Sequence, residues 1–128
     1  MGCLRHKEAD LVDISRMSAF FESDMGRRVL SSPEVRREWS FDYVLDETGA
    51  THLQGIIDCA FREAGGWVVL DYKTDRFEDD SAFVERHQRQ LNWYRIALAD
   101  LTGEPVTGMW LWSIRKERAY PVPVIEVR

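Results

Sequence analysis

Two aspartates and a lysine stand in apolar stretches of the chain, where charged side chains are uncommon. Asp58 follows two isoleucines, and Asp71 follows two valines and a leucine, with Lys73 two positions further on. Burying a carboxylate is unfavourable unless a cation or a metal ion lies beside it. Carboxylate oxygens are also the ligands that hard divalent cations prefer. These residues therefore indicate either a partly buried ion pair with Lys73 or a metal-binding site.

The spacing of these residues predicts that they share one face of a β-hairpin. A turn at 64–65 would place Asp58 directly opposite Asp71, whereas a turn at 65–66 would place Asp58 opposite Lys73. In either register the three side chains point the same way, because strand side chains alternate with a period of two, although a three-residue turn would break this parity. Opposed Cβ atoms lie ~5 Å apart. Two carboxylates that close repel each other unless a cation lies between them.

Hydrophobic periodicity predicts the elements that must position the hairpin. Apolar residues follow a helical period from Leu11 to Leu30, with breaks at Gly26 and over 31–33. The other predicted elements are strands over 35–45, 53–62 and 67–73, a helix over 81–101, a strand over 106–114 and a possible edge strand over 118–127. A helix, a three-stranded meander, a helix and a returning strand imply an α+β fold, sandwich-like, with a mixed central sheet. We expect one domain over 1–128, with 1–10 disordered.

The first predicted strand shows the alternation of a half-buried strand. Its apolar side chains would share one face and its polar side chains the other. The apolar face comprises Val35, Trp39, Phe41 and Tyr43, and the polar face comprises Arg36, Glu38, Ser40 and Asp42. We therefore expect one face of this strand to lie on the core along its whole length.

The composition excludes several classes of protein. Apolar residues make up 45% and charged residues 30% of the 128 residues, and the formal net charge is −5. That charge argues against a broad surface that coats nucleic acid, but it is compatible with carboxylates around a metal ion. No apolar run is long enough to span a membrane and no signal peptide is recognisable, so we expect a cytoplasmic protein. Two cysteines cannot ligate an iron–sulfur cluster, and no phosphate-binding loop provides an ATP site.

The order of the motifs resembles the PD-(D/E)xK nuclease superfamily. The resemblance rests on Gly55 to Asp58, on Asp71-Tyr72-Lys73, and on Gln90 to Tyr94. The closer resemblance is to the RecB/AddA-type nuclease domain at the C-terminal end of a UvrD-like helicase–nuclease, where sequences like 20–26 and Arg37-Glu38 precede the motif. It covers residues ~18–114. The Gln90 and Tyr94 motif favours this branch over a restriction-type endonuclease of the same superfamily.

The resemblance implies a restriction-endonuclease-like core and a metal-dependent DNA exonuclease that acts in double-strand-break repair and recombination. Asp58 and Asp71 would be carboxylate ligands of Mg²⁺ or Mn²⁺, and the Tyr72 carbonyl would be a further oxygen ligand. Lys73 would position or help to deprotonate the attacking water and stabilise charge at the phosphate. Gln90 and Tyr94, four residues apart on one helix face, would support the site and contact DNA.

Other residues have weaker claims to function. Glu38 could reach a second metal ion, although its strand face would more often be solvated. Arg76 could contact a phosphate, as could Arg86, Arg89 and Arg95, although such a helix is more often a mixed surface. The five tryptophans are mostly expected to pack in the core or at its edge. Trp93 could stack on a base, but we expect it to be buried.

The chain departs from the family pattern in one motif. RecB-like nucleases carry a histidine ligand in a Gly-x-x-x-His motif on an upstream helix, and the letters from Gly2 to His6 fit at the wrong spacing. We expect the chain to be truncated before that motif and to be a weak nuclease by itself. His52 and His87 do not fit the motif and are expected to be neutral surface or packing residues.

The resemblance also implies partners. These are DNA, as a single strand or a duplex end, and a helicase that is either attached to the chain or provided by an AddB/RecC-like subunit. The alternative function is a catalytically weak or inactive nuclease-fold module, which guides DNA or docks a partner protein.

Overall fold

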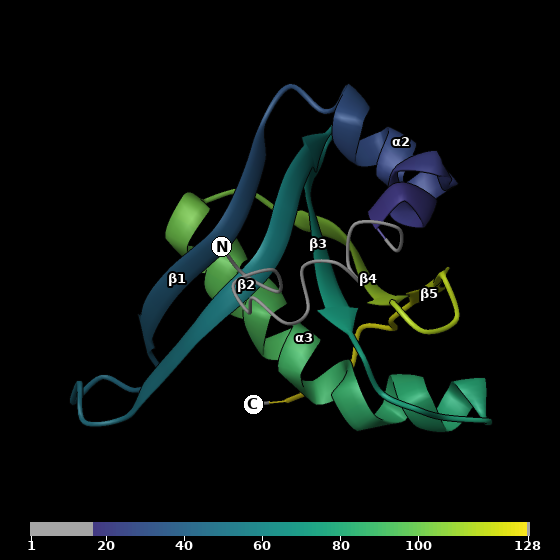
Figure 1. Ribbon diagram of the computed structural model, residues 1–128. Coiled ribbons are helices and arrows are strands. Elements are labelled where there is room, and N and C mark those ends of the chain that lie inside the picture. The colour runs from purple at the N-terminus through teal and green to yellow at the C-terminus, as the bar shows by residue number, and fades with distance from the viewer. Residues whose placement is uncertain (1–16, 128) are drawn as a thin grey trace.

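The chain folds around a five-stranded sheet with a helix packed on each face (Figure 1). The computed structural model describes residues 17–127. Its elements, in chain order, are α2 (Asp24–Ser31), β1 (Val35–Val44), β2 (His52–Glu63), β3 (Gly66–Lys73), α3 (Asp80–Thr102), β4 (Val106–Ser113) and β5 (Arg118–Pro121). The strands lie in the sheet in the order β1-β2-β3-β4-β5, so neighbours in space are neighbours in sequence.

The predicted α+β architecture with a mixed sheet is confirmed. β3 and β4 run parallel and are joined by α3, whereas the other strand pairs are antiparallel. The last predicted strand is too long, because β5 ends at Pro121. Beyond it the Asn92 side chain of α3 donates to the Pro123 carbonyl at 2.9 Å and accepts from the Ile125 N–H at 3.0 Å. The final segment therefore packs on the helix instead of extending the sheet.

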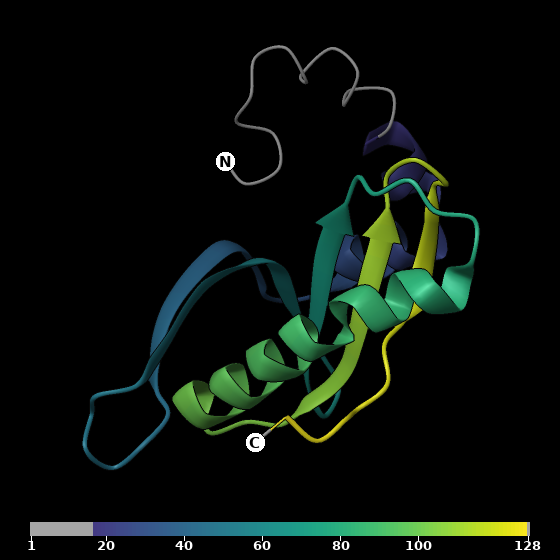
Figure 2. The ribbon, with the colours of Figure 1, turned by 90° about the horizontal axis from the view of Figure 1, so that it is seen from below.

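Two clusters of buried residues fill the space on either side of the sheet. Figure 2 shows α3 and α2 on opposite sides of β3 and β4. The α3-side core contains helix residues Phe83, Leu91 and Leu98 and strand residues Ile57, Ala60, Val69 and Leu111. The α2-side core contains Phe20, Met25 and Val29 together with Cys59, Phe61, Leu70 and Trp112. Burial of the sheet on both faces explains the almost continuous apolar run in β3.

The predicted N-terminal helical pattern is confirmed for the described residues, but it breaks at Ser23 and not at Gly26. Residues 17–22 are helical, and the Ser23 hydroxyl caps α2 by accepting the Gly26 N–H at 3.0 Å. Gly26 lies inside α2, and a Cβ there would stand 2.0 Å from the Phe20 carbonyl oxygen. Glycine is needed at this position because the two helical segments approach closely.

The turn between β2 and β3 takes the first of the two predicted registers. Cys59 pairs with Leu70, and Glu63 pairs with Gly66, so the two-residue turn is 64–65. Gly65 has a φ of +96°, a conformation that side-chain-bearing residues rarely adopt. Extended by one residue beyond the pair of Cys59 with Leu70, this register places Asp58 opposite Asp71.

The regular alternation expected for the first strand is wrong at Glu38, where β1 changes faces. Trp39 and Phe41 pack against the α3-side core as predicted, but Val35 packs against the α2-side core. Glu38 has a φ of +52°, and the β1–β2 ladder omits the pair of Glu38 with Asp58. The left-handed residue rotates the chain between the two halves of the strand, which simple alternation cannot predict.

The strain at Glu38 predicts an inverted order of substitutions. In an ordinary strand, alanine is more stable than glycine by about 0.5–1 kcal/mol. Because Glu38 is left-handed, we expect Glu38→Gly to be more stable than Glu38→Ala by about 1 kcal/mol in urea denaturation. The same pair of substitutions at Ser40, two residues along β1, serves as the control and should keep the ordinary order. If the alanine variant is more stable than the glycine variant at both positions, a left-handed backbone at Glu38 is contradicted.

Candidate metal and active site

Strand β2 separates from β3 at Asp58, the first of the predicted site residues. The β2–β3 ladder ends at the pair of Cys59 with Leu70, whereas β3 stays paired with β4 as far as Lys73. The next N–H of β3 on this side, that of Tyr72, donates to Asp58 Oδ2 at 3.0 Å. The Asp58 carboxylate thus replaces a main-chain acceptor where β1 and β2 diverge from β3 (Figure 1).

Asp71 is the most buried charged residue of the candidate site. It is 4% exposed, and its Oδ2 lies 2.9 Å from Lys73 Nζ. This oxygen makes no hydrogen bond of regular geometry with any residue in 17–127. Burial, followed by the hydrogen bond and charge of Asp58, raises the pKa of Asp71 to about 8, although Lys73 opposes the shift. A metal-free site therefore holds a proton on this pair at neutral pH.

Helix α3 contributes two side chains to the same face. Gln90 Oε1 accepts from Lys73 Nζ at 3.0 Å. Tyr94, one turn later, is buried, and its pKa is raised to about 12 by burial and then by the charges of Asp71 and Asp58. The structure therefore brings together all of the predicted site residues on β2, β3 and α3, although their chemical roles stay predictions.

Gly55 of β2 allows α3 to approach the site closely. A Cβ at Gly55 would lie 3.0–3.1 Å from ring atoms of Phe41 and Tyr94. The two rings meet edge to face with centroids 5.5 Å apart. The glycine at the start of the predicted motif is thus explained by packing, because a larger side chain would push Tyr94 away from the carboxylates.

The side chains present fit a hard divalent cation. Burial is the main cause of the raised pKa of Asp71, and the nearby Asp58 carboxylate raises it further, so a divalent cation here would relieve both effects. Both carboxylates offer oxygen atoms, and the Tyr72 carbonyl would be a third oxygen of the kind that Mg²⁺ accepts. Within residues 17–127, no three His, Cys, Asp or Glu side chains gather in a metal-binding group.

The other residues that the sequence singled out lie outside this group of side chains. Glu38 is half-buried on β1 at the interruption opposite Asp58. Arg76 is exposed, and it makes no ion pair or hydrogen bond within the described part of the chain. His6 lies outside the described residues. His52 lies on the surface as expected, and hydrogen bonds to Asp42 and then to a carbonyl oxygen raise its pKa.

The sequence reasoning missed a second cluster beside the site. Asp75 Oδ2 lies 2.8 Å from His87 Nε2 and 2.6 Å from a guanidinium nitrogen of Arg86. This cluster joins the segment that follows Lys73 to the first half of α3, the helix that carries Gln90. The only signal in the sequence was spacing, because Asp75 follows Lys73 by two residues and His87 precedes Gln90 by three.

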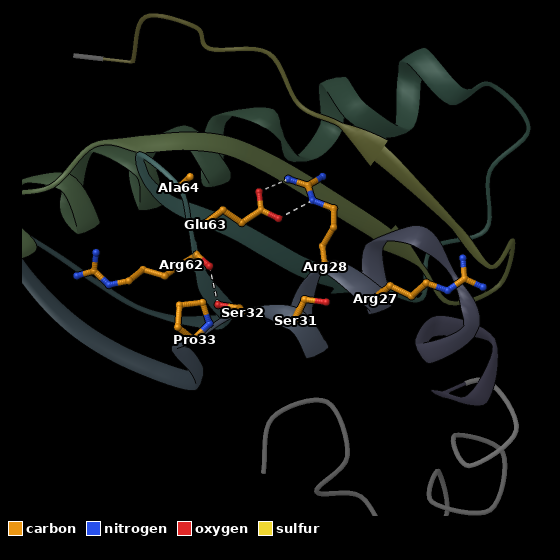
Figure 3. Close-up of a pocket in the computed structure, with 8 residues that line it drawn as sticks. All are labelled: Arg27, Arg28, Ser31, Ser32, Pro33, Arg62, Glu63 and Ala64. Atoms are coloured by element: carbon orange, nitrogen blue, oxygen red, sulfur yellow. Dashed lines mark hydrogen bonds and ion pairs between the residues drawn. The ribbon is translucent and has the colours of Figure 1, made fainter.

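An open cavity of about 580 Å³ lies beside the β2–β3 turn, away from this site (Figure 3). It is lined by Arg27, Arg28, Ser31, Ser32, Pro33, Arg62, Glu63 and Ala64. Arg28 forms two hydrogen bonds with Glu63, of 2.8 and 2.7 Å, and Arg62 reaches both Glu34 and Glu104. Because carboxylates neutralise these two arginines, we assign the cavity no part in binding a phosphate.

Comparison with known proteins identifies the class to which this fold and site belong. Residues 7–127 match the family described as the PD-(D/E)XK nuclease superfamily, so the chain belongs to that superfamily. The predicted resemblance is confirmed.

Among its relatives are proteins named as the A-type subunits of ATP-dependent helicase/nucleases. The one from Clostridium novyi is 34% identical over 83% of this chain, and the one from Oceanobacillus iheyensis is 29% identical over 94%. A third, from Clostridium perfringens strain 13, is 33% identical over 90%. The matches cover 10%, 11% and 11% of these relatives, so the chain spans about a tenth of their length. In residues 17–127, no helix is long and apolar enough to cross a membrane.

Proposed function

We propose that this chain is a metal-dependent nuclease domain that hydrolyses phosphodiester bonds in DNA. The observation that carries the proposal is the pairing of buried Asp71 with half-buried Asp58, with Lys73 beside them. Such a pair is unfavourable in a purely structural role, because burial of Asp71 raises its pKa instead of stabilising its charge. Membership of the nuclease superfamily supports the same conclusion.

The residues present suggest how the reaction is organised. Asp58, Asp71 and the Tyr72 carbonyl would hold Mg²⁺ or Mn²⁺, which supplies charge to polarise the phosphate and to acidify water. Lys73, fixed between Asp71 and Gln90, places a cation where charge develops on the phosphate and where the attacking water is oriented. The Asp58 carboxylate is itself held by the Tyr72 N–H, so the site is largely preorganised.

We further propose that the domain acts as an exonuclease within an ATP-dependent helicase–nuclease. The support is the name of its relatives, which joins a helicase and a nuclease. A cytoplasmic role in repair and recombination of broken DNA, next to an AddB/RecC-like partner protein, follows from the same analogy.

Substitution of Asp58 tests the nuclease function. We expect Asp58→Ala to reduce Mg²⁺-dependent cleavage of single-stranded DNA by at least about 100-fold, as for loss of a group that stabilises the transition state. Asp42→Ala, an exposed aspartate of β1, is the matched control and should cleave normally. Circular dichroism should show both variants folded. Cleavage by a folded Asp58→Ala protein at the rate of the unchanged chain would refute the assignment.

Metal binding gives a second readout that does not depend on cleavage. Because the pKa of Asp71 is raised to about 8, binding of Mn²⁺ at pH 7 should release close to one proton. Calorimetric titration in two buffers of different ionisation enthalpy measures that proton. Binding with no proton release would place the metal away from Asp71, and absence of binding by the unchanged chain would favour the inactive module.

A further inference from the structure

One flank of α3 next to the candidate site carries residues whose polar or aromatic groups are not used by the fold. Gln90 fixes the position of this flank, since its side chain contacts Lys73 Nζ at 3.0 Å. Arg89 precedes Gln90, and Trp93 lies one helical turn after it. Residues three or four apart share a helix face, so Trp93 is a surface neighbour of both Arg89 and Gln90 on α3.

Trp93 differs from the other tryptophans in its packing. Trp67 and Trp112 are core residues, and Trp39 and Trp110 pack against a core cluster. Trp93 is half-buried, and in residues 17–127 it belongs to neither cluster and makes no ring–ring contact. Trp93 is therefore less buried than expected. A large aromatic ring held beside the site, but outside the core, is free to contact a ligand.

The arginines of α3 also differ in whether their side chains have a structural partner. Arg86 is paired with Asp75, and Arg95 donates to the Asn92 side chain and the Ile125 carbonyl, so both have structural partners. Arg89 is exposed, and within the described residues it makes neither an ion pair nor a hydrogen bond. An unpaired guanidinium retains its full capacity for a phosphate.

We propose that Arg89 and Trp93 form a track for a single-stranded polynucleotide along α3, with Arg89 on a phosphate and Trp93 stacked on a base. The commitment to a single strand follows from the ring, because only an unpaired base can offer its face to a side chain beside the strand. Gln90 is a neighbour of Trp93 on the helix surface and contacts Lys73, so a strand stacked on Trp93 would run beside the candidate site. That last step, but not the binding itself, rests on the proposed nuclease function.

Binding without catalysis tests the track. Anisotropy of a fluorescein-labelled oligothymidylate, measured with the full chain in EDTA, reports affinity while no cleavage occurs. We expect Trp93→Ala to weaken binding about tenfold and Trp93→Phe to retain most of the affinity, because a phenyl ring still stacks. Leu101→Ala is the control for loss of an exposed apolar side chain on the same helix, at 55% exposure, and should bind normally.

The salt dependence of binding tests Arg89 separately. One phosphate contact to a single strand contributes about 0.7 to the slope of log affinity against log salt concentration, so Arg89→Ala should lower that slope by about this amount. Arg27→Ala, an exposed arginine of α2, should leave the slope unchanged. An oligouridylate of the same length shows whether DNA or RNA is preferred, and binding of either through Trp93 supports the track.

Two outcomes would overturn the proposal. One is unchanged affinity in folded Trp93→Ala and Arg89→Ala proteins, and the other is an equal loss for single-stranded and duplex DNA, which would exclude stacking on an unpaired base. Cleavage of the same oligothymidylate in Mg²⁺ keeps the two ideas separate. Cleavage by the unchanged chain without any effect of Trp93 removes the track alone, whereas binding through Trp93 without cleavage removes the nuclease function alone.

Discussion

Replacing Asp71 with asparagine should stabilise the metal-free protein at neutral pH while abolishing metal-dependent cleavage. The Asp71 carboxyl is 4% exposed, and its pKa is raised from 3.8 to about 8. Folding therefore forces this group to take up a proton at pH 7. Asparagine has nearly the same shape and needs no proton, so we expect the free energy of unfolding to rise by roughly 2 kcal/mol, a fraction of the full linkage energy because the contact of Lys73 with a carboxyl oxygen is altered.

The sign of the pH dependence follows from the direction of the shift. Between pH 3.8 and about 8 the folded chain binds more protons at Asp71 than the unfolded chain does. Stability from this group is therefore greatest below its unfolded pKa and falls as pH rises towards the folded pKa. Urea denaturation in EDTA at pH 5 and pH 8 should show a larger loss for the unchanged chain than for Asp71→Asn.

A matched variant separates the cost of burying the Asp71 carboxyl from the general effect of removing a negative charge. Asp42→Asn removes an exposed carboxylate whose pKa is lowered by a hydrogen bond from His52, so it should not raise stability at pH 7. If Asp71→Asn instead destabilises the chain at every pH, Asp71 is a structural partner of Lys73, and the ion-pair interpretation of the sequence would hold.

Strand periodicity and a two-residue turn were enough to predict that the strand residues of the candidate site share one face, although two registers stayed open. Asp58 and Asp71 come together for the reason predicted, a two-residue turn at 64–65. The contact of Lys73 with Gln90 could not be derived from spacing, because it depends on how α3 crosses the sheet. Helix crossing is set by side-chain packing, and here the absence of a side chain at Gly55 permits the close approach of Tyr94.

The failures of the sequence reasoning have local causes. Alternation in β1 breaks at Glu38 because a residue with positive φ rotates the strand, and no residue type in that segment indicates such a backbone. Gly26 suggested a helix end, although it serves a close approach to Phe20. Trp93 was expected to be buried because tryptophan is highly buried on average, whereas it is half-buried and its neighbours on this flank of α3 are Arg89 and Gln90.

Lys73 should prove essential for catalysis and dispensable for metal binding. Its Nζ lies 2.9 Å from Asp71 Oδ2 and 3.0 Å from Gln90 Oε1, so the ammonium group is fixed and cannot itself be a ligand of a cation. Its positive charge also opposes the rise in the pKa of Asp71. Removing it has two opposing effects on a metal ion: stronger competition from the proton on Asp71, and loss of repulsion between two cations.

We therefore expect Lys73→Ala to change the calorimetric affinity for Mn²⁺ by less than about tenfold, while kcat for single-stranded DNA falls by about 100-fold or more. Gln90→Ala removes one partner of the ammonium group but keeps its charge, so it should lower kcat by a smaller factor and leave Mn²⁺ affinity unchanged. That ordering distinguishes a charge that acts on the phosphate from one that only holds Asp71 in place. If Lys73→Ala reduces metal affinity and kcat by the same factor, Lys73 acts only by holding Asp71 in place. A misplaced Asp71 carboxylate would lower the metal affinity and kcat together.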